Sequence, residues 1–319
     1  MTESEKKLQK TLDKEEKKYR KNLTKKWKNM RTKDPKMFWK ILYQGKCRDQ
    51  PGISLEKLFE FFKNLNAAPS NDITVDLPNL NDDDLSQLNH DLNIPIDKEE
   101  ILECIKKLKN NKASGEDEII NEYIKATREQ FSDIYEKLFN IIFDTGNVPE
   151  IWLIGNIIPV YKNKGDSNDP KNFRPITIVS CLGKLFTAIL TERLNKYSDR
   201  FMILNENQCG FRQGYSTIDN IFTLHAFFEL LKRKGKKLYC AFVDFEKAFD
   251  KVWRDGLWYK LLINNINGRM FQIIQNVYKN IKSNIVYNNE KSQFFPCDNG
   301  VRQGENMSPF LFALFLNDL

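Results

Sequence analysis

Apolar positions recur along most of the chain with the spacing of amphipathic helices. Leu12, Tyr19, Leu23 and Trp27 follow one another at steps of seven and four, which predicts a helix through residues 12–30 with lysines on its opposite face. Asp97 and Glu100 have the spacing of a capping box and begin another predicted helix. Further helices are predicted at residues 54–66, 183–194, 217–231, 256–265 and 269–281, and near residues 308–309.

Shorter apolar runs between these helices indicate strands. Residues 156–161 form one candidate, and residues 238–245, rich in apolar and aromatic side chains, predict a buried strand. Residues 284–287 and 294–297 predict a hairpin around Asn288 and Asn289. Because helices and strands mix without regular alternation, the pattern favours the α+β class over a doubly wound sheet.

Charge divides the 319-residue chain into three zones. Residues 1–48 hold 17 basic and 6 acidic residues, a net charge of +11, and are interpreted as a basic helical extension. Residues 49–142 form an acidic, helical connector, and the net charge over residues 49–122 is −10. The basic helix could follow a phosphate backbone, or it could be a solvated helix that packs its apolar stripe elsewhere; the second is the commoner use of such helices.

Composition excludes several classes of protein. No apolar run approaches the roughly 18 residues of a membrane span, and the charged N-terminal stretch does not resemble a signal peptide. The six cysteines are scattered singly and there are only two histidines, so neither a zinc-type spacing nor a His-rich metal centre is present. We therefore expect a reduced, intracellular protein of the nucleus and/or cytoplasm, without contact to membranes.

Acidic residues offer two candidate metal sites. Asp82, Asp83 and Asp84 stand at a predicted helix start, where carboxylates favour the positive end of the helix dipole, and this use is preferred over a metal site. Asp244 follows an apolar run, and a carboxylate there is costly unless it is paired or binds a cation. Both a metal ligand and a cap for the next turn fit Asp244. Asp250, six residues further on, could pair with Asp244 for acid–base chemistry, but a third group to complete such a site is missing.

Several sequence blocks together form a recognisable pattern. Residues 242–252 read Phe-Val-Asp-Phe-Glu-Lys-Ala-Phe-Asp-Lys-Val, and this block resembles the first palm motif of the reverse transcriptases of non-LTR retrotransposons. The blocks below agree with that family in order and spacing. Residues 171–176 resemble its fingers motif, and residues 300–304 with 308–309 and 317–319 resemble its second palm motif. Residues 208–217 match its Gly-Phe-Arg block, while residues 112–119 and 149–152 resemble the stretch that leads into the domain.

The resemblance implies an architecture. Residues 143–319 would form the fingers and a partial palm of a right-hand polymerase, preceded by a mostly helical N-terminal extension. The family carries a further pair of adjacent aspartates on a hairpin after the Gln-Gly block, and the sequence stops at Leu319 before such a hairpin. We therefore expect an incomplete two-ion site, inactivity of this chain alone, and an exposed sheet edge and apolar face that favour aggregation.

The same resemblance implies the roles of individual residues. Asp244 would bind catalytic Mg²⁺ or Mn²⁺ with help from the backbone carbonyl of Phe245, because nucleotidyl transfer uses two divalent cations. Residues implied to bind the incoming dNTP are Lys162 (or the equally placed Lys164), Arg174, Phe249, Gln303 and Gly304. Phe249 would crowd the sugar 2′ position and favour deoxynucleotides, although a core aromatic fits the sequence as well. Phe211 and Arg212 would contact the template strand.

Two functions therefore stand. The first is RNA-templated DNA synthesis, with an RNA template, a DNA primer and dNTPs as partners. The second is a non-catalytic, nucleic-acid-binding remnant of a retroelement. An unrelated metal-dependent phosphotransferase is the least favoured alternative.

Overall fold

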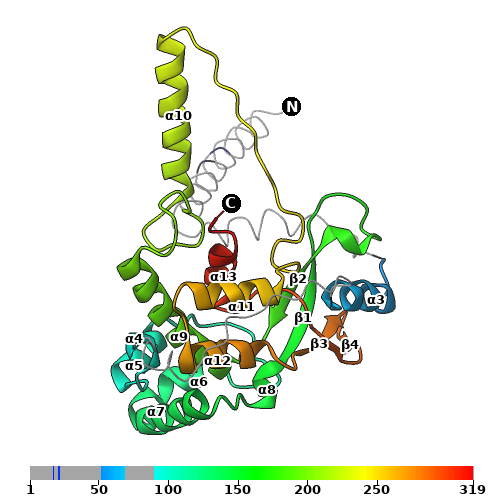
Figure 1. Cartoon of the computed structure of the whole chain (residues 1–319). Coiled ribbons are helices and arrows are strands. Elements are labelled where there is room, and N and C mark those ends of the chain that lie inside the picture. The colour runs from blue at the N-terminus through cyan, green and yellow to red at the C-terminus, as the bar shows by residue number, and fades with distance from the viewer. Residues whose placement is uncertain (1–16, 18–20, 22–51, 69–89, 319) are drawn as a thin grey trace, which may run out of the picture. The chain divides into compact units, whose positions relative to one another are not determined.

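The computed structural model describes residues 17, 21, 52–68 and 90–318 (Figure 1). The chain divides into two units, Met1–Gly52 and Ile53–Leu319, and the fold described below is that of the second. Lys17 and Lys21 are helical, whereas the rest of the helix predicted at residues 12–30 lies outside the described residues. The triplet at residues 82–84 lies outside them as well.

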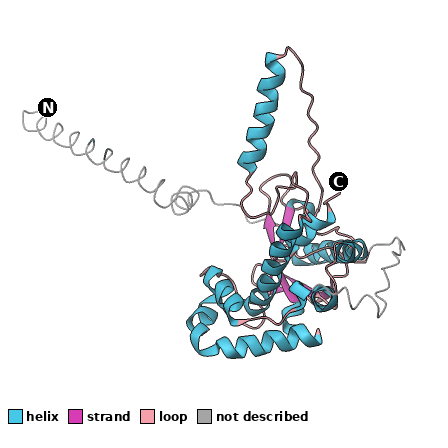
Figure 2. Ribbon diagram, turned by 60° about the vertical axis from the view of Figure 1, so that its left-hand side comes forward, coloured by secondary structure: helices cyan, strands magenta, loops and turns pink. Residues whose placement is uncertain are grey.

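The described part of the second unit mixes helices and strands, which confirms the α+β class (Figure 2). No helix among the described residues has the length and apolar character needed to cross a membrane. The helices are α3 (Leu55–Asn66), α4 (His90–Asn93), α5 (Lys98–Lys107), α6 (Asn121–Ala126), α7 (Arg128–Thr145), α8 (Glu150–Leu153), the 3-10 helix η2 (Pro170–Asn172), α9 (Cys181–Phe201), α10 (Thr217–Arg233), α11 (Arg254–Ile263), α12 (Gly268–Tyr278) and α13 (Ser308–Phe315). The strands are β1 (Ile154–Tyr161), β2 (Phe173–Ile178), β3 (Lys282–Tyr287), β4 (Glu290–Lys291) and β5 (Phe295–Pro296).

The strands form one mixed sheet with β1 at its centre. β1 pairs antiparallel with β2, from Asn156 opposite Ile178 to Tyr161 opposite Phe173, and parallel with β3. β4 returns directly against β3, so the turn predicted at Asn288 is confirmed. β5 also pairs antiparallel with β3, at Lys282 and Ser283, and so continues the return of the predicted hairpin along that strand.

The strand predicted at residues 238–245 is wrong, because this segment forms neither a helix nor a strand in the structure. Its side chains are exposed rather than buried: Tyr239, Phe242 and Val243 keep 85%, 84% and 81% of their surface accessible. A strand exists only through hydrogen bonds to a neighbouring strand, and β1 already has β2 and β3 as neighbours. Among the described residues no strand edge pairs with this segment.

The helix predicted at residues 217–231 is present as α10, begun by the side chain of Ser216, whose hydroxyl accepts a hydrogen bond from the Ile218 backbone NH. None of its own residues is buried, although Ile218, Ile221 and Phe222 are large and apolar. The amphipathic pattern therefore predicted the helix correctly, but in the described chain nothing covers its apolar side chains.

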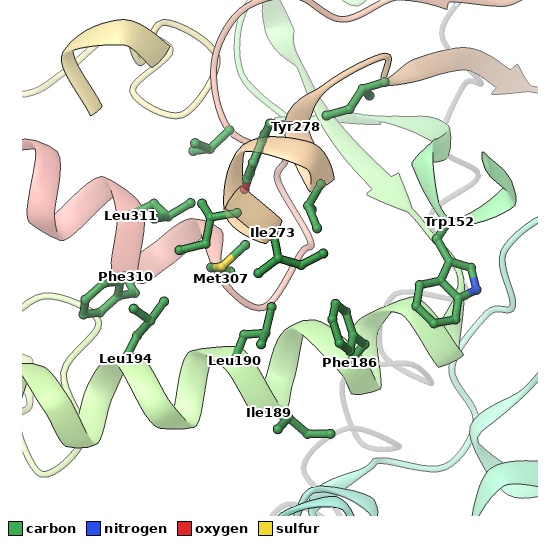
Figure 3. Close-up of a cluster of buried hydrophobic side chains, with 14 of the residues drawn as sticks. Trp152, Phe186, Ile189, Leu190, Leu194, Ile273, Tyr278, Met307, Phe310 and Leu311 are labelled. Atoms are coloured by element: carbon green, nitrogen blue, oxygen red, sulfur yellow. The ribbon is translucent and has the colours of Figure 1, made fainter. Parts of the chain in front are cut away.

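The hydrophobic core is built around α9, the longest described helix. Figure 3 shows Leu190 and Leu194 of α9 facing Ile273 of α12 and Leu311 of α13, all of them buried. At the N-terminal end of α9, the missing side chain of Gly183 lets Trp152 pack against the helix backbone. This core packs α9, α12 and α13 against one another.

An ion pair with a buried arginine joins α9 to the first turn of α5. The side chain of Arg193 is 5% exposed, and its guanidinium donates hydrogen bonds of 2.8 and 2.6 Å to the two carboxylate oxygens of Glu100. It also donates to the backbone carbonyls of Ile94 and Pro95 at 2.6 and 2.8 Å. Glu100 is at the same time the third residue of the predicted capping box with Asp97, which the structure confirms. One carboxylate therefore begins α5 and binds α9.

Replacing Arg193 by alanine is expected to lower the free energy of unfolding by about 3–5 kcal/mol, because it leaves the Glu100 carboxylate and two carbonyls half-buried without their cation. Urea unfolding followed by circular dichroism measures this change. The matched control is Arg200→Ala, which removes an exposed pair with Asp91 and is expected to cost less than about 1 kcal/mol. Equal losses in the two variants would contradict the role given to Arg193.

Candidate nucleotide and nucleic-acid site

Residues 297–305 form a loop that follows β5 and precedes α13. It contacts both the segment before α11 and the sheet. The backbone NH of Val301 donates a hydrogen bond of 2.8 Å to the carbonyl of Phe249, and the NH of Gly300 donates one of 3.1 Å to the carbonyl of Val252. Gly300 adopts φ +71°, and a Cβ atom there would lie 2.6 Å from the Phe249 carbonyl oxygen. Two motifs that lie about fifty residues apart in the sequence are thus in direct backbone contact.

The end of the same loop is attached to the β2 side of the sheet. The backbone NH of Thr177 donates a 2.9 Å hydrogen bond to the carbonyl of Gln303. Gly304 has φ +115°, and a Cβ atom at this position would stand 2.6 Å from the carbonyl oxygen of Thr177. Only glycine allows so close an approach of two backbones. β2 also carries Arg174, whose side chain is exposed.

Two arginines hold this loop in place, Arg254 at the start of α11 and Arg302 within the loop itself. The guanidinium of Arg254 donates hydrogen bonds of 2.9–3.2 Å to four backbone carbonyls. The acceptors are Tyr278, Cys297, Asn299 and Gly300. Arg302, which is 9% exposed, donates to the carbonyls of Trp152 and Leu153. Burial lowers the pKa of both guanidinium groups. The Arg254 bonds supply partners to three carbonyls of a loop without regular structure, and the Arg302 bonds attach that loop to α8.

Three aromatic rings from distant parts of the chain meet beside this loop. The ring of Phe249 stacks on Phe312 of α13, with centroids 4.9 Å apart and planes at 19°. Phe211 contacts both rings edge-on, with its centroid 5.8 Å from that of Phe249 and 6.5 Å from that of Phe312. Phe211 itself is 60% exposed. The cluster therefore places two of the residues predicted to contact nucleotide and template against each other.

The other predicted cationic residues have partners within the chain. The ammonium of Lys162 donates a 2.7 Å hydrogen bond to the carbonyl of Lys171, across the loop between β1 and β2. Arg212 lies over the ring of Tyr215, donates to the carbonyl of Asn205 at 3.2 Å, and pairs with Asp199 at 3.5 Å. Its Nε–H is buried and has no partner. Arg212 is thus largely occupied in holding the loop before α10.

Asp244 and Phe245 stand apart from this arrangement. Both lie in the exposed, unpaired segment described above, and Phe245 keeps 49% of its surface accessible. In the part of the chain that the structure describes, no group of three or more His, Cys, Asp or Glu side chains could hold a metal ion. Asp244 is therefore a single carboxylate there, without the further acidic ligands that a two-ion site requires.

Comparison with known proteins identifies the domain to which these motifs belong. The family described as reverse transcriptase (RNA-dependent DNA polymerase) matches residues 161–319. The chain belongs to the reverse transcriptase family. The match covers β2, the loop of residues 297–305 and the aromatic cluster.

The similar proteins come from non-LTR transposons. The chain is 30% identical over 227 residues to the probable RNA-directed DNA polymerase from transposon BS of Drosophila melanogaster, an alignment that covers 70% of this chain and 25% of that protein. It is 28% identical over 223 residues to the RNA-directed DNA polymerase from mobile element jockey of the same organism, covering 69% and 24%. With the Pol polyprotein of the type-1 retrotransposable element R2 of Nasonia vitripennis it shares 30% over 177 residues, covering 56% and 17%. The chain thus spans about a quarter of the length of the first two relatives.

For a reverse transcriptase domain, the predicted site residues divide into two groups. Phe249, Phe211, Gln303 and Gly304 are brought together by the loop and the aromatic cluster. Asp244 lies in the exposed segment apart from them, and the described residues do not by themselves make a site that fits two divalent cations.

Two residues of this region carry no functional signal in the sequence. Arg254 stands at the first position of α11, and its role is invisible there because its acceptors are backbone carbonyls. Lys184 near the beginning of α9 is predicted only as a helix residue, yet it lines a cavity beside Gly304. Both roles depend on contacts between segments that are distant in the sequence.

Asp250 is half-buried beneath the loop, and burial raises the pKa of its carboxyl from 3.8 to about 6, against the opposing charges of Lys247 and Lys162. The folded chain therefore holds this proton more tightly than the unfolded chain. The stabilising contribution is complete below about pH 4 and is lost as the pH rises through about 6, by at most about 3 kcal/mol.

We expect Asp250→Asn to remove this decrease in the free energy of unfolding, because the amide does not ionise. Urea unfolding at pH values between about 4 and 7 measures it. Asp255→Asn, at an exposed position on α11, is the control and should keep the original pH dependence. The same slope in the Asp250 variant and the original chain would contradict the assignment.

Gly304→Ala is expected to destabilise the fold by at least about 2 kcal/mol, because the new methyl group meets the Thr177 carbonyl and φ is unfavourable. The matched control is Gly214→Ala. Gly214 has φ +87° but no atom within 4 Å of the added Cβ, so that substitution carries only the backbone cost of about 1–2 kcal/mol. Thermal unfolding compares the two variants, and a Gly304→Ala protein as stable as the Gly214→Ala protein would refute the close approach.

Proposed function

We propose that this chain takes part in RNA-templated DNA synthesis as a segment of a non-LTR retrotransposon reverse transcriptase. The observation that carries the proposal is the backbone contact of residues 300–303 with both residues 249–252 and Thr177, within the region that matches the family. Three motif blocks that are separate in sequence are thereby held at one place. The names of the transposon relatives support the same reaction.

In this proposal, the aromatic cluster and the loop form the nucleotide side of the site. Phe249 limits space at the sugar 2′ position, and its ring is held in place by stacking on Phe312. Gln303 and Gly304 present backbone close to the nucleotide. Arg174 is exposed and has no partner among the described residues, so it is free to reach phosphate oxygens. A guanidinium group suits this role because its planar fork of N–H donors binds two phosphate oxygens at once.

Lys162 and Arg212 fit their proposed roles less directly. Lys162 would have to release the carbonyl of Lys171 to reach a triphosphate, and Lys164 on the same loop is an alternative. Arg212 would act through position, since it holds the loop on which the exposed Phe211 stands ready to stack on a template base.

We further propose Asp244, with the backbone carbonyl of Phe245, as a ligand of Mg²⁺ or Mn²⁺. Such ions supply Lewis-acid activation of the primer hydroxyl and charge stabilisation at the phosphates. Magnesium prefers oxygen ligands, and both groups are exposed and available to it. A two-ion site needs more carboxylates than the described residues bring to Asp244, so these residues alone do not complete the metal centre.

That same observation favours a second candidate function. With no metal-binding cluster among the described residues and with four lysines lining one cavity, the described surface is also suited to bind nucleic acid without synthesis. The two functions differ in one measurable product, the extended primer.

In the chain joined to the further carboxylates that the site requires, Asp244→Asn is expected to reduce primer extension at least about a hundredfold, measured with an RNA template, a DNA primer, dNTPs and Mg²⁺. Glu246→Gln, in the same exposed segment, is the matched control and should retain synthesis. The size of the extended DNA on a denaturing gel is the readout.

Extension that survives in the Asp244 variant would contradict the proposed ligand. If the chain joined to these further carboxylates binds the primer–template without extending it, the non-catalytic function is the correct one.

A further inference from the structure

A cavity of about 640 Å³ lies between the turn after α5, the end of β2 and the first turns of α9. It borders the Gln303–Gly304 loop, because Gly304 and Asn306 line one side of it. Four of its lining residues are lysines: Lys107, Lys109, Lys112 and Lys184. Glu192 is the acidic residue among the residues that line it.

Lys184 is the least exposed of these lysines. Lys184 is half-buried and lies in the first turn of α9. No carboxylate pairs with its ammonium group in the described chain. Burial lowers the pKa of this ammonium, and the positive charge of Lys112 lowers it further, against the opposite influence of Cys181 and Glu305. A buried cation without a counter-ion is costly, and an anion placed in the cavity would remove that cost.

Neither Glu192 nor Glu305 supplies this anion. Glu192 is engaged with Lys107 at 2.9 Å, and both side chains of that pair are partly exposed. Glu305 is bound by Tyr278 at 3.1 Å and by the Met307 NH at 3.2 Å. Lys109 and Lys112 are exposed and have no carboxylate partner among the described residues. Three lysines therefore line the cavity with their charge uncompensated.

We infer that this cavity binds the phosphodiester backbone of a nucleic-acid strand, with Lys184 contacting one phosphate and Lys109 and Lys112 its neighbours along the strand. The inference deepens the proposed function and rests on it for the identity of the strand, a template or primer passing the Gln303–Gly304 loop. We call this cavity, lined by the three lysines, Gly304 and Asn306, the lysine cavity. It would contact the strand outside the nucleotide site.

The layout of the charges favours a polymer over a free phosphate. The three lysines come from two segments, the turn after α5 and the start of α9. A single inorganic phosphate would be expected to gather its cations around one point, whereas a strand meets cations spread along its path. The lining also contains apolar and small groups, including Ile176, Ile178 and Ala188, which suit the sugar and base portions of a strand.

The test measures binding of fluorescein-labelled single-stranded RNA to the full chain by fluorescence anisotropy over a series of salt concentrations. Lys184→Gln is expected to weaken binding about threefold to tenfold at low salt and to reduce the slope of log K against log salt by about 0.7, the value for one phosphate on a single strand. Lys184→Arg, which keeps the charge, should restore most of both. Thermal unfolding shows that each variant is folded.

Two further substitutions complete the set. Lys112→Gln changes an exposed residue of the cavity, so it should fold normally and reduce the slope in the same way even if Lys184→Gln does not fold. Lys137→Gln on α7 removes the same charge at an exposed position outside the cavity and serves as the matched control. Equal slopes for the Lys137 and the Lys184 and Lys112 variants would overturn the inference.

Competition distinguishes the source of the phosphate. Inorganic phosphate or dATP should not displace the RNA at concentrations that leave the ionic strength unchanged; displacement by either one, lost in Lys184→Gln, would replace the strand by a free phosphate or nucleotide. Primer extension is scored separately. A Lys184-dependent RNA affinity supports the cavity whether or not a primer is extended, whereas RNA binding that does not depend on Lys184 refutes the cavity even where synthesis occurs.

Discussion

The arrangement of the candidate site depends on how the loop of residues 297–305 satisfies its backbone groups. Most of this loop is buried, yet it contains almost no regular hydrogen bonding, so each carbonyl needs a donor from elsewhere. The guanidinium of Arg254 donates to three loop carbonyls, while the backbones of Phe249, Val252 and Thr177 bind other groups of the loop. Arg302, itself a loop residue, donates to the carbonyls of Trp152 and Leu153 and so attaches the loop to α8. The cost of burying the two guanidinium groups is offset because their hydrogen bonds end on carbonyl oxygens that would otherwise lack partners.

This constraint explains why the reverse transcriptase motifs meet where they do. The loop cannot move away from β2 without breaking the Thr177 bond, and glycine at position 304 permits that bond. The aromatic cluster then fixes Phe249 and Phe211 on the other side of the loop. The lysine cavity borders the same loop, so a strand held there would pass directly beside the residues proposed to hold the nucleotide.

Two apolar parts of the described chain contribute little to this organised region. The segment of residues 238–245 and the helix α10 expose side chains such as Phe242 and Phe222. Exposed apolar surface of this extent marks places where proteins associate. One of these two elements, the segment of residues 238–245, carries Asp244. The proposed metal ligand therefore stands on the least supported segment of the site.

The local elements and the family could be predicted without the fold. Periodicity and capping residues predicted α3, α5, α9 and α13, and the turn at Asn288, because these depend on contacts within a few residues. The order and spacing of the motif blocks identified the reverse transcriptase family from the sequence as well. Packing between distant segments determines instead that residues 238–245 have no strand partner, that Arg254 holds a loop more than forty residues away, and that Lys184 shares a cavity with other lysines. Each of these depends on which distant segment is adjacent in space, and neither hydrophobic spacing nor composition records that.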